Sequence, residues 1–186
     1  MKPLLLLVAA LTLSLTGCAA SDQNDADVTF AQQMVPHHEQ AVEMADLALD
    51  PARDASSEVR DLATRIKKAQ GPEIREMKDW LDDWDADESM GGGMDHGDHG
   101  DHGGDHGSME GMEGMMSDSA MSALGRASGA AFDRQWLQMM IEHHEGAVTM
   151  SRTEIKDGKD ADAKKLARGI TATQQKEIAE MKELLR

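Results

Sequence analysis

Two copies of one histidine motif determine how this chain is interpreted: MVPHHEQAVEMA at residues 34–45 and MIEHHEGAVTMS at residues 140–151. Seven of the twelve aligned positions are identical, including both histidines. Two later segments, QGPEIREMKDWL at residues 70–81 and QQKEIAEMKELL at residues 174–185, repeat in the same order. The first pair aligns with an offset of 106 residues and the second with an offset of 104. Duplication of one unit is the simplest explanation, with a turn that is two residues shorter in the second copy.

Apolar residues in each copy recur at the i, i+3, i+4, i+7 spacing of an amphipathic helix. In the first copy this spacing predicts a helix that begins near Thr29 and ends at the Asp-Pro step at residue 50. A second helix is predicted at about residues 56–84, and the Gly-Pro step at residues 71–72 should kink or break it. No segment shows the sustained alternation of a strand. We therefore predict an all-α fold, a four-helix bundle made of two duplicated helical hairpins.

The first residues have the features of an export signal. A lysine precedes an apolar run that is too short to span a bilayer comfortably, and the run ends in LTGC with Cys18. This ending resembles the lipobox of bacterial lipoproteins, which implies cleavage before Cys18, lipidation of its thiol, and a membrane-anchored protein that faces the periplasm or the cell surface. The alternative is an ordinary secretory signal with a chance cysteine. Cys18 is the only cysteine, so no intrachain disulfide can form.

Charge and composition narrow the classes of partner. The formal net charge is −16, so the chain repels nucleic acid and attracts cations, and we predict no nucleic-acid partner. The 15 methionines are less usual, as is an aromatic content of 3% without any tyrosine. Methionine and histidine can bind metal outside the cytoplasm without depending on reduced thiols. Metal ions are therefore the predicted ligands.

A long glycine-rich segment separates the two copies. Residues 89–122 contain four Asp-His-Gly units and seven methionines, and this composition predicts a linker that is disordered without a ligand. Imidazole and carboxylate groups on a flexible chain can bind Cu(II), Zn or Ni, and the thioethers suit Cu(I), so the linker is predicted to be a buffer of low specificity. A solvated spacer is the alternative. The candidate ligands in the linker are His96, His99, His102 and His106, with Met109, Met112, Met115 and Met116. The predicted division is a signal peptide at residues 1–17, a tether at 18–28, hairpins at 29–84 and 129–186, and the linker at 85–128.

The histidine motifs place metal ligands on one face of a helix. Met34 lies three and four residues before His37 and His38, so its thioether can approach both imidazoles from the preceding turn. The second copy repeats this arrangement, and the two histidine helices can face each other across the core. The candidate core ligands are Met34, His37, His38, Met44, Met140, His143, His144 and Met150, completed by Met77 and Met181. Glu39 and Glu145 follow the histidine pairs and are expected to orient an imidazole or to bind Cu(II).

The types of ligand favour copper. Thioethers are soft donors that suit Cu(I), and imidazole accepts Cu(I), Cu(II) and Zn. Di-iron bundles instead carry a glutamate three residues before the histidine, where this chain has a methionine in both copies. Cu(I) is therefore favoured, with Cu(II) as a second form. Two alternatives for the motifs are core packing without metal and sensing of pH.

Both histidine segments and both later segments resemble the domain-of-unknown-function family 305 (DUF305), a group of exported helical proteins that includes copper-binding members. The resemblance covers Thr29 to Arg186 apart from the linker, and the Asp-His-Gly insertion departs from it. It implies a ferritin-like four-helix bundle and copper binding in copper tolerance. The ligands that it implies are Met34, His37, His38 and Met44 in the first copy and Met140, His143, His144 and Met150 in the second.

Together these features predict a lipid-anchored copper-binding protein that sequesters copper or hands it to a copper-handling partner. We predict that it is not an enzyme, because the Glu-x-x-His frames of di-iron bundles and the serine elbow of hydrolases are both missing from the sequence. A metal-dependent oxidase, either a cuproxidase or a ferroxidase, is the first alternative. A helical interaction module that binds no metal is the second.

Overall fold

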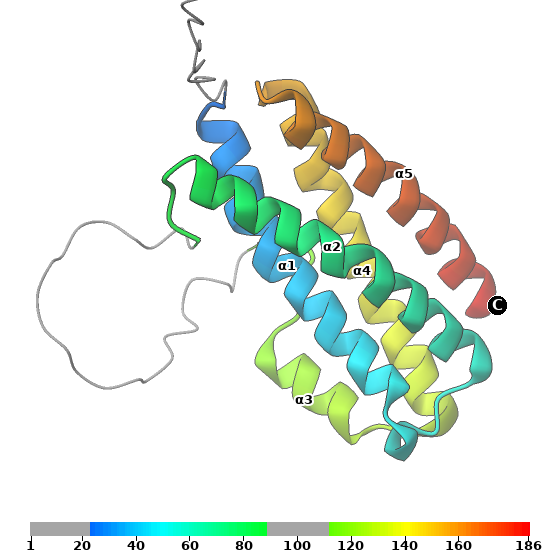
Figure 1. Cartoon of the computed structure of the whole chain (residues 1–186). Helices are drawn as coiled ribbons and strands as arrows, with labels where there is room; N and C mark the ends of the chain where they lie inside the picture. Colours follow the sequence, from blue (N-terminus) through cyan, green and yellow to red (C-terminus); the bar gives the residue numbers. More distant parts are fainter. Residues whose placement is uncertain (1–22, 89–111) are drawn as a thin grey trace, which may run out of the picture.

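The computed structural model describes residues 23–88 and 112–186 and contains helices throughout (Figure 1). The helices are α1 (Asp25–Leu49), the short 3-10 helix η1 (Pro51–Arg53), α2 (Ser57–Asp83), α3 (Asp118–Arg126), α4 (Gly129–Asp157) and α5 (Ala161–Leu184). Helices α1 and α2 pack as one hairpin and α4 and α5 as the other, and the two hairpins meet mainly through antiparallel α1 and α4. The predicted bundle of two duplicated hairpins is confirmed, and the described residues contain no strand.

Helix α1 begins four residues before the predicted position. Asn24 is its N-cap, and the Asn24 side chain accepts hydrogen bonds from the main-chain N–H groups of Ala26 and Asp27. The Asp27 carboxylate accepts from the Asn24 N–H at 2.6 Å, which completes a capping box. Apolar periodicity does not reveal a polar first turn, and the predicted start at Thr29 is therefore wrong. The end of α1 before Asp50 agrees with the prediction.

The Gly-Pro step was predicted to kink or break α2, and the predicted break is absent, because Pro72 lies inside one continuous helix. A proline in a helix interior removes one hydrogen bond and costs about 3 kcal/mol. Ile66 lies before the step and Met77 and Leu81 after it, and all three side chains are fully buried. Burial of one apolar stripe on both sides of Pro72 offsets this cost, so the helix stays continuous.

The predicted disorder of residues 89–122 is wrong for residues 112–122, and residues 89–111 lie outside the described ranges. Ser117 caps α3 by accepting from the Ala120 N–H at 3.3 Å. Leu124 of α3 is fully buried and Met116 nearly so, and both belong to the core. The sequence did not predict these two buried side chains, because the segment as a whole is rich in glycine and aspartate.

The predicted export signal, the lipidation site at Cys18 and the four histidines of the linker all lie outside the described residues. Among the helices that are described, none has a stretch long and apolar enough to span a bilayer.

The core has two apolar clusters, one at each end of the bundle. The larger cluster contains Phe132 and Trp136, and the Trp136 indole N–H donates to the Met44 carbonyl oxygen at 2.8 Å. The smaller cluster contains Phe30 and Ile170. Each cluster contains residues of both α1 and α4. Other residues occupy the middle of the α1–α4 contact, between the two clusters.

A buried carboxylate ties the start of α1 to the turn between α4 and α5. Asp27 is fully buried and accepts hydrogen bonds from the main-chain N–H groups of Lys159 and Asp160, each at 3.0 Å. Glu154 is buried beside it, and the loss of water, followed by the nearby Asp27 carboxylate, raises the pKa of Glu154 to about 8. A Cβ at Gly158 would lie 2.0 Å from Glu154 Oε1, so this turn accepts only glycine without rearrangement.

The free energy of unfolding of Glu154→Gln should lack the fall that the wild type shows as the pH rises toward 8. The folded chain holds the Glu154 proton up to about pH 8 and the unfolded chain only to about 4.5, so the stability that this proton provides falls as the pH rises from about 4.5 to 8 and is gone above 8. Urea unfolding of the wild type at pH 6.5 to 9.5 should show a fall that levels off near pH 8, and Glu154→Gln should be flat. Glu145→Gln, at an exposed position of the same helix, is the control. An equal fall in Glu154→Gln would contradict the assignment.

Candidate metal centre

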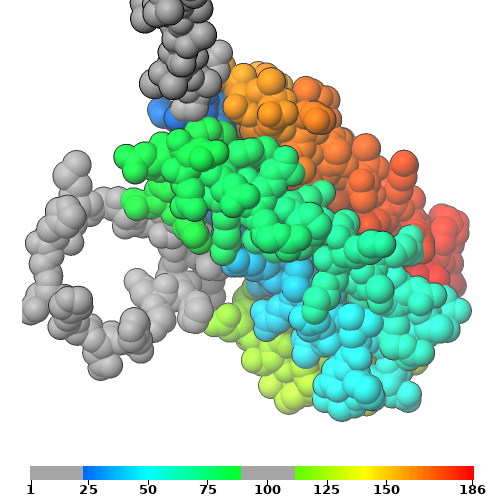
Figure 2. Space-filling view, viewed as in Figure 1, coloured from blue at the N-terminus to red at the C-terminus, as the bar shows by residue number. Residues whose placement is uncertain are grey.

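Four fully buried histidines occupy the layer between the two apolar clusters. His37 and His38 come from α1, and His143 and His144 come from α4. The rings of His37 and His143 face each other across the α1–α4 contact, with centroids 3.7 Å apart and planes inclined by 35°. The prediction that the two histidine helices face each other across the core is therefore confirmed. Figure 2 shows side chains of α2 covering much of one face of the bundle.

Two carboxylates from the outer helices hold the second histidine of each pair. His38 Nε2 lies 2.9 Å from Glu73 Oε2 on α2, and His144 Nε2 lies 2.8 Å from Glu177 Oε2 on α5. An ionised carboxylate only accepts hydrogen bonds, so in the neutral ring Nε2 carries the proton and Nδ1 has the lone pair. Nδ1 of His38 and of His144 has no hydrogen-bond partner among the described residues. Each carboxylate thus leaves one ring nitrogen free to bind a metal.

Glu73 and Glu177 take the role that was expected of Glu39 and Glu145, and that expectation is wrong. Glu39 pairs with Lys78 at 2.9 Å, and Glu145 pairs with Lys182 at 2.8 Å, both with about half of the glutamate side chain exposed. The sequence does contain a signal for the true pair, since both later segments share a glutamate four residues before the methionine on the inner stripe. Each lies on the buried side of its helix.

Burial keeps the inner histidines neutral. Loss of water, and then the neighbouring rings of His38 and His144, lower the pKa of His37 to about 3 against the opposing effect of the Glu113 backbone. Burial, and then the charge of His37, lowers the pKa of His143 well below its usual value. Neither nitrogen of either ring has a hydrogen-bond partner of normal geometry among the described residues. Neutral imidazoles are the form that binds metals.

The six methionines predicted as core ligands are all buried and divide between the two apolar clusters, three in each. The members of one group are Met34, Met77 and Met150, and those of the other are Met44, Met140 and Met181. Each group combines residues of both hairpins, because α1 and α4 are antiparallel. The methionine before one histidine pair therefore lies in the same cluster as the methionine after the other pair.

The core offers imidazole nitrogens and thioether sulfurs rather than oxygen ligands. Within residues 23–88 and 112–186, no three histidine, cysteine, aspartate or glutamate side chains stand together in a group that would hold a metal ion by themselves. The carboxylates of Glu73 and Glu177 are already engaged with Nε2 of their histidines. A metal in this layer would therefore draw on imidazole nitrogens of the four histidines and on thioethers.

The domain of unknown function DUF305 matches residues 27–185, which is most of the chain. The chain belongs to the DUF305 family. A crystal structure of a DUF305 protein from Streptomyces coelicolor, described as secreted, is 35% identical, with a TM-score of 0.73 over 89% of this chain and 92% of that one. The protein CopM in a Cu(II)-bound form is 31% identical, with a TM-score of 0.67 over 86% and 95% of the two chains. CopM has also been solved with Cu(I) and with silver.

A curated relative is known from a virus. The uncharacterized protein L153 of Acanthamoeba polyphaga mimivirus is 45% identical over 53 residues, which is 28% of this chain. The match spans 35% of the viral protein, about a third of its length. This match covers one part of the chain and carries no information about function.

Proposed function

We propose that this DUF305 protein binds copper in the layer of buried histidines and methionines, with Cu(I) favoured and Cu(II) accepted. The observation that carries the proposal is the set of six buried ring nitrogens, two each on His37 and His143 and one each on His38 and His144, that have no hydrogen-bond partner of normal geometry among the described residues. An unpaired buried polar atom costs about 1–3 kcal/mol. A chain that keeps six of them in one layer gains from a ligand that bonds to them.

The chemistry of this layer supports copper above other metals. Imidazole and thioether together suit Cu(I), whereas thioethers are poor ligands for iron, manganese and magnesium. Solved forms of CopM with Cu(I), Cu(II) and silver support the same choice, because silver is a soft ion like Cu(I). Glu73 and Glu177 would orient the outer imidazoles and raise the basicity of the nitrogen that binds.

The cellular role that we propose is extracytoplasmic and needs no turnover. A chain exported and anchored through Cys18 would sequester copper at the cell envelope or hand it to a partner protein. The Asp-His-Gly histidines of the linker would raise the local capture probability beside the bundle. Exchange of a metal ion between ligands suffices for this role, so we propose a binding protein rather than an enzyme.

The test is an anaerobic Cu(I) titration of the mature chain with Cys18→Ser, against a chromophoric competing chelator. The core variant is His37→Ala with His143→Ala, and the linker variant replaces His96, His99, His102 and His106 by alanine. We expect the core variant to lose at least about 100-fold in affinity at its tightest site, since even outer-sphere changes cost 10–100-fold. The linker variant should keep that site and bind fewer ions in total.

The linker variant is also the matched control, since it removes twice as many histidines without touching the bundle. Substitution is preferable to deletion, because Met116 and Leu124 at the end of the linker pack into the core. If the core variant kept the tight site and the linker variant lost it, the paired motifs would be packing alone and the proposal would be wrong.

A further inference from the structure

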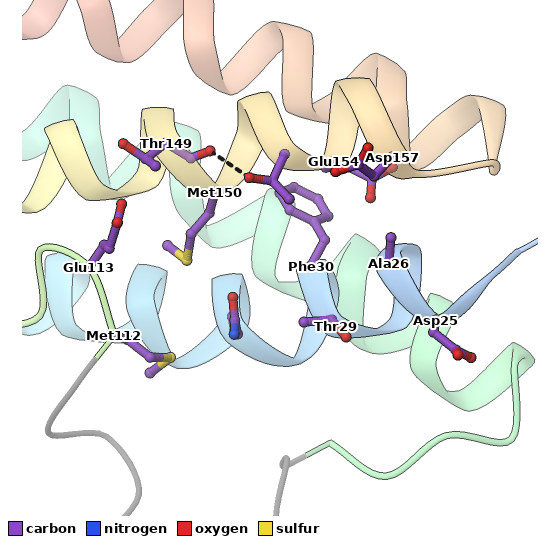
Figure 3. Close-up of a pocket in the computed structure, with 12 residues that line it drawn as sticks. Asp25, Ala26, Thr29, Phe30, Met112, Glu113, Thr149, Met150, Glu154 and Asp157 are labelled. Carbon is purple, nitrogen blue, oxygen red and sulfur yellow. Dashed lines mark hydrogen bonds between the residues drawn. The ribbon is translucent and has the colours of Figure 1, made fainter.

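Residues 112–116, here called the strap, lie across the contact between α1 and α4 immediately before α3. Figure 3 shows Met112 and Glu113 on this loop, beside the α1 and α4 ribbons. The strap crosses the bundle at the level of the histidine layer, as its contacts show. It is the described part of the linker that touches the candidate metal centre.

One glutamine holds the C-terminal end of the strap on α1. The Gln40 side-chain amide donates to the Met116 carbonyl oxygen at 2.9 Å, and the Met116 N–H donates to Gln40 Oε1 at 2.8 Å. Gln40 lies three residues after His37, on the adjacent turn of the same helix face. The strap is therefore fixed to α1 next to His37.

Two glycines allow the middle of the strap to lie directly on α4. A Cβ at Gly146 would lie 2.0 Å from the Glu113 carbonyl oxygen, which is far inside van der Waals contact. Gly114 has a φ of +81°, and a Cβ there would lie 2.8 Å from the Glu142 oxygen and 3.0 Å from the His143 oxygen. The strap backbone thus rests on the turn of α4 that carries His143, and the backbone of Glu113 acts on the pKa of His37.

A cavity opens beside the strap. Its volume is about 670 Å³, and its walls include Met112 and Glu113 of the strap, Phe30 of α1 and Met150 of α4 (Figure 3). Met112 and Met150 offer thioethers there, the donors that suit Cu(I). Helices α1, α2, α4 and α5 are held together by two apolar clusters, whereas the strap contributes one buried side chain, Met116, to one of them. Detaching the strap therefore requires less free energy than separating any of these four helices.

We propose that the strap is the gate of the histidine layer, through which metal reaches His37 and His143 when residues 112–116 lift from Gln40 and Gly146. This inference rests on the proposed function for its cargo. The four histidines are fully buried with the strap in place, so a metal ion needs a route that this structure keeps closed. Detachment of the strap joins the cavity to the layer without separating the hairpins.

The test measures access to the histidines first and metal second. Diethyl pyrocarbonate modifies neutral imidazoles that solvent can reach, and mass spectrometry gives the rate at His37 and at His143 in the metal-free mature chain. Gln40→Ala removes both hydrogen bonds to Met116, and we expect modification to rise roughly tenfold. Gly146→Ala displaces the strap directly and should have the larger effect. Anaerobic Cu(I) uptake should accelerate in both variants.

Two control variants match these changes. Gln32→Ala removes a glutamine of α1 that donates to the Asp87 carbonyl oxygen at 2.8 Å. Gly169→Ala changes a helical glycine that has no other atom within 4 Å of the added methyl group. Both should leave the modification rates unchanged. Alanine forms helices better than glycine, so the Gly146→Ala chain should keep its helix content. If that chain loses helix content, the result for Gln40→Ala decides the test.

The outcomes separate the gate from its cargo. Unchanged histidine modification in folded Gln40→Ala and Gly146→Ala chains would overturn the gate. Faster modification in both variants, together with Cu(I) uptake that also accelerates, is the expected result. If both variants were modified faster but the wild-type chain bound no Cu(I), the strap would remain the gate of the histidine layer and the proposed function would be overturned.

Discussion

Leucine at both His37 and His143 should make the metal-free chain more stable, raising its free energy of unfolding by about 2 kcal/mol. The two rings bury four nitrogens without hydrogen-bond partners of normal geometry, and each such atom carries a desolvation cost of about 1–3 kcal/mol. Leucine fills a similar volume without polar atoms, although some overpacking between the facing positions will reduce the gain. Urea unfolding at pH 7 with a metal chelator present measures the difference.

The control for this result is Met34→Leu with Met140→Leu, which places leucine one turn earlier on the same two helices. A swap of similar volume at these buried sites should change stability by less than about 1.5 kcal/mol. If leucine at the histidine positions instead lowered the free energy of unfolding well beyond this control, the imidazoles would be structural. If the leucine variant were more stable and no longer bound copper, the histidines would serve ligand binding and reduce the stability of the metal-free fold.

The histidine layer itself could be predicted from the sequence, because duplication and helical periodicity together fix it. Two copies of one amphipathic helix bury the same stripe, so both histidine pairs are expected on the faces that meet, where His37 and His143 are found together. The carboxylate partners could also have been found. Glu39 follows His38 directly, and neighbouring residues on a helix point about 100° apart, so Glu39 should face away from the histidine. Glu73 shares the inner stripe of its helix with Met77.

The grouping of the methionines and the path of the strap could not be predicted in the same way. Which methionines share a cluster depends on how far α1 slides along α4, and periodicity within one helix does not contain that distance. The strap depends on a close backbone approach between Gly114 and Gly146, two glycines far apart in the chain. Glycine in a linker usually signals flexibility, and its use as a contact surface appears only in the folded chain.

Acid should destabilise the metal-free protein from about pH 6.5 downwards. The folded chain holds His37 neutral to about pH 3 and His143 neutral well below its usual range, whereas both titrate near 6.5 when unfolded. The unfolded chain therefore binds more protons in this window, and stability that is complete above pH 6.5 is lost as the pH falls. Each histidine contributes about 1.4 kcal/mol per pH unit, or about 2.7 kcal/mol per pH unit for the pair.

Urea unfolding at pH 7, 6 and 5 measures this slope, and leucine at both positions should reduce it by most of that amount. A smaller slope should remain, because burial also lowers the pKa of His144 against the opposing effect of Glu177. The same slope in the wild type and the double variant would show that the two rings are hydrated or paired in solution. Cu(I) should raise the free energy of unfolding of the wild type by about the same amount at each pH and leave the slope unchanged, because the folded chain already holds both rings neutral and the metal displaces no proton from them.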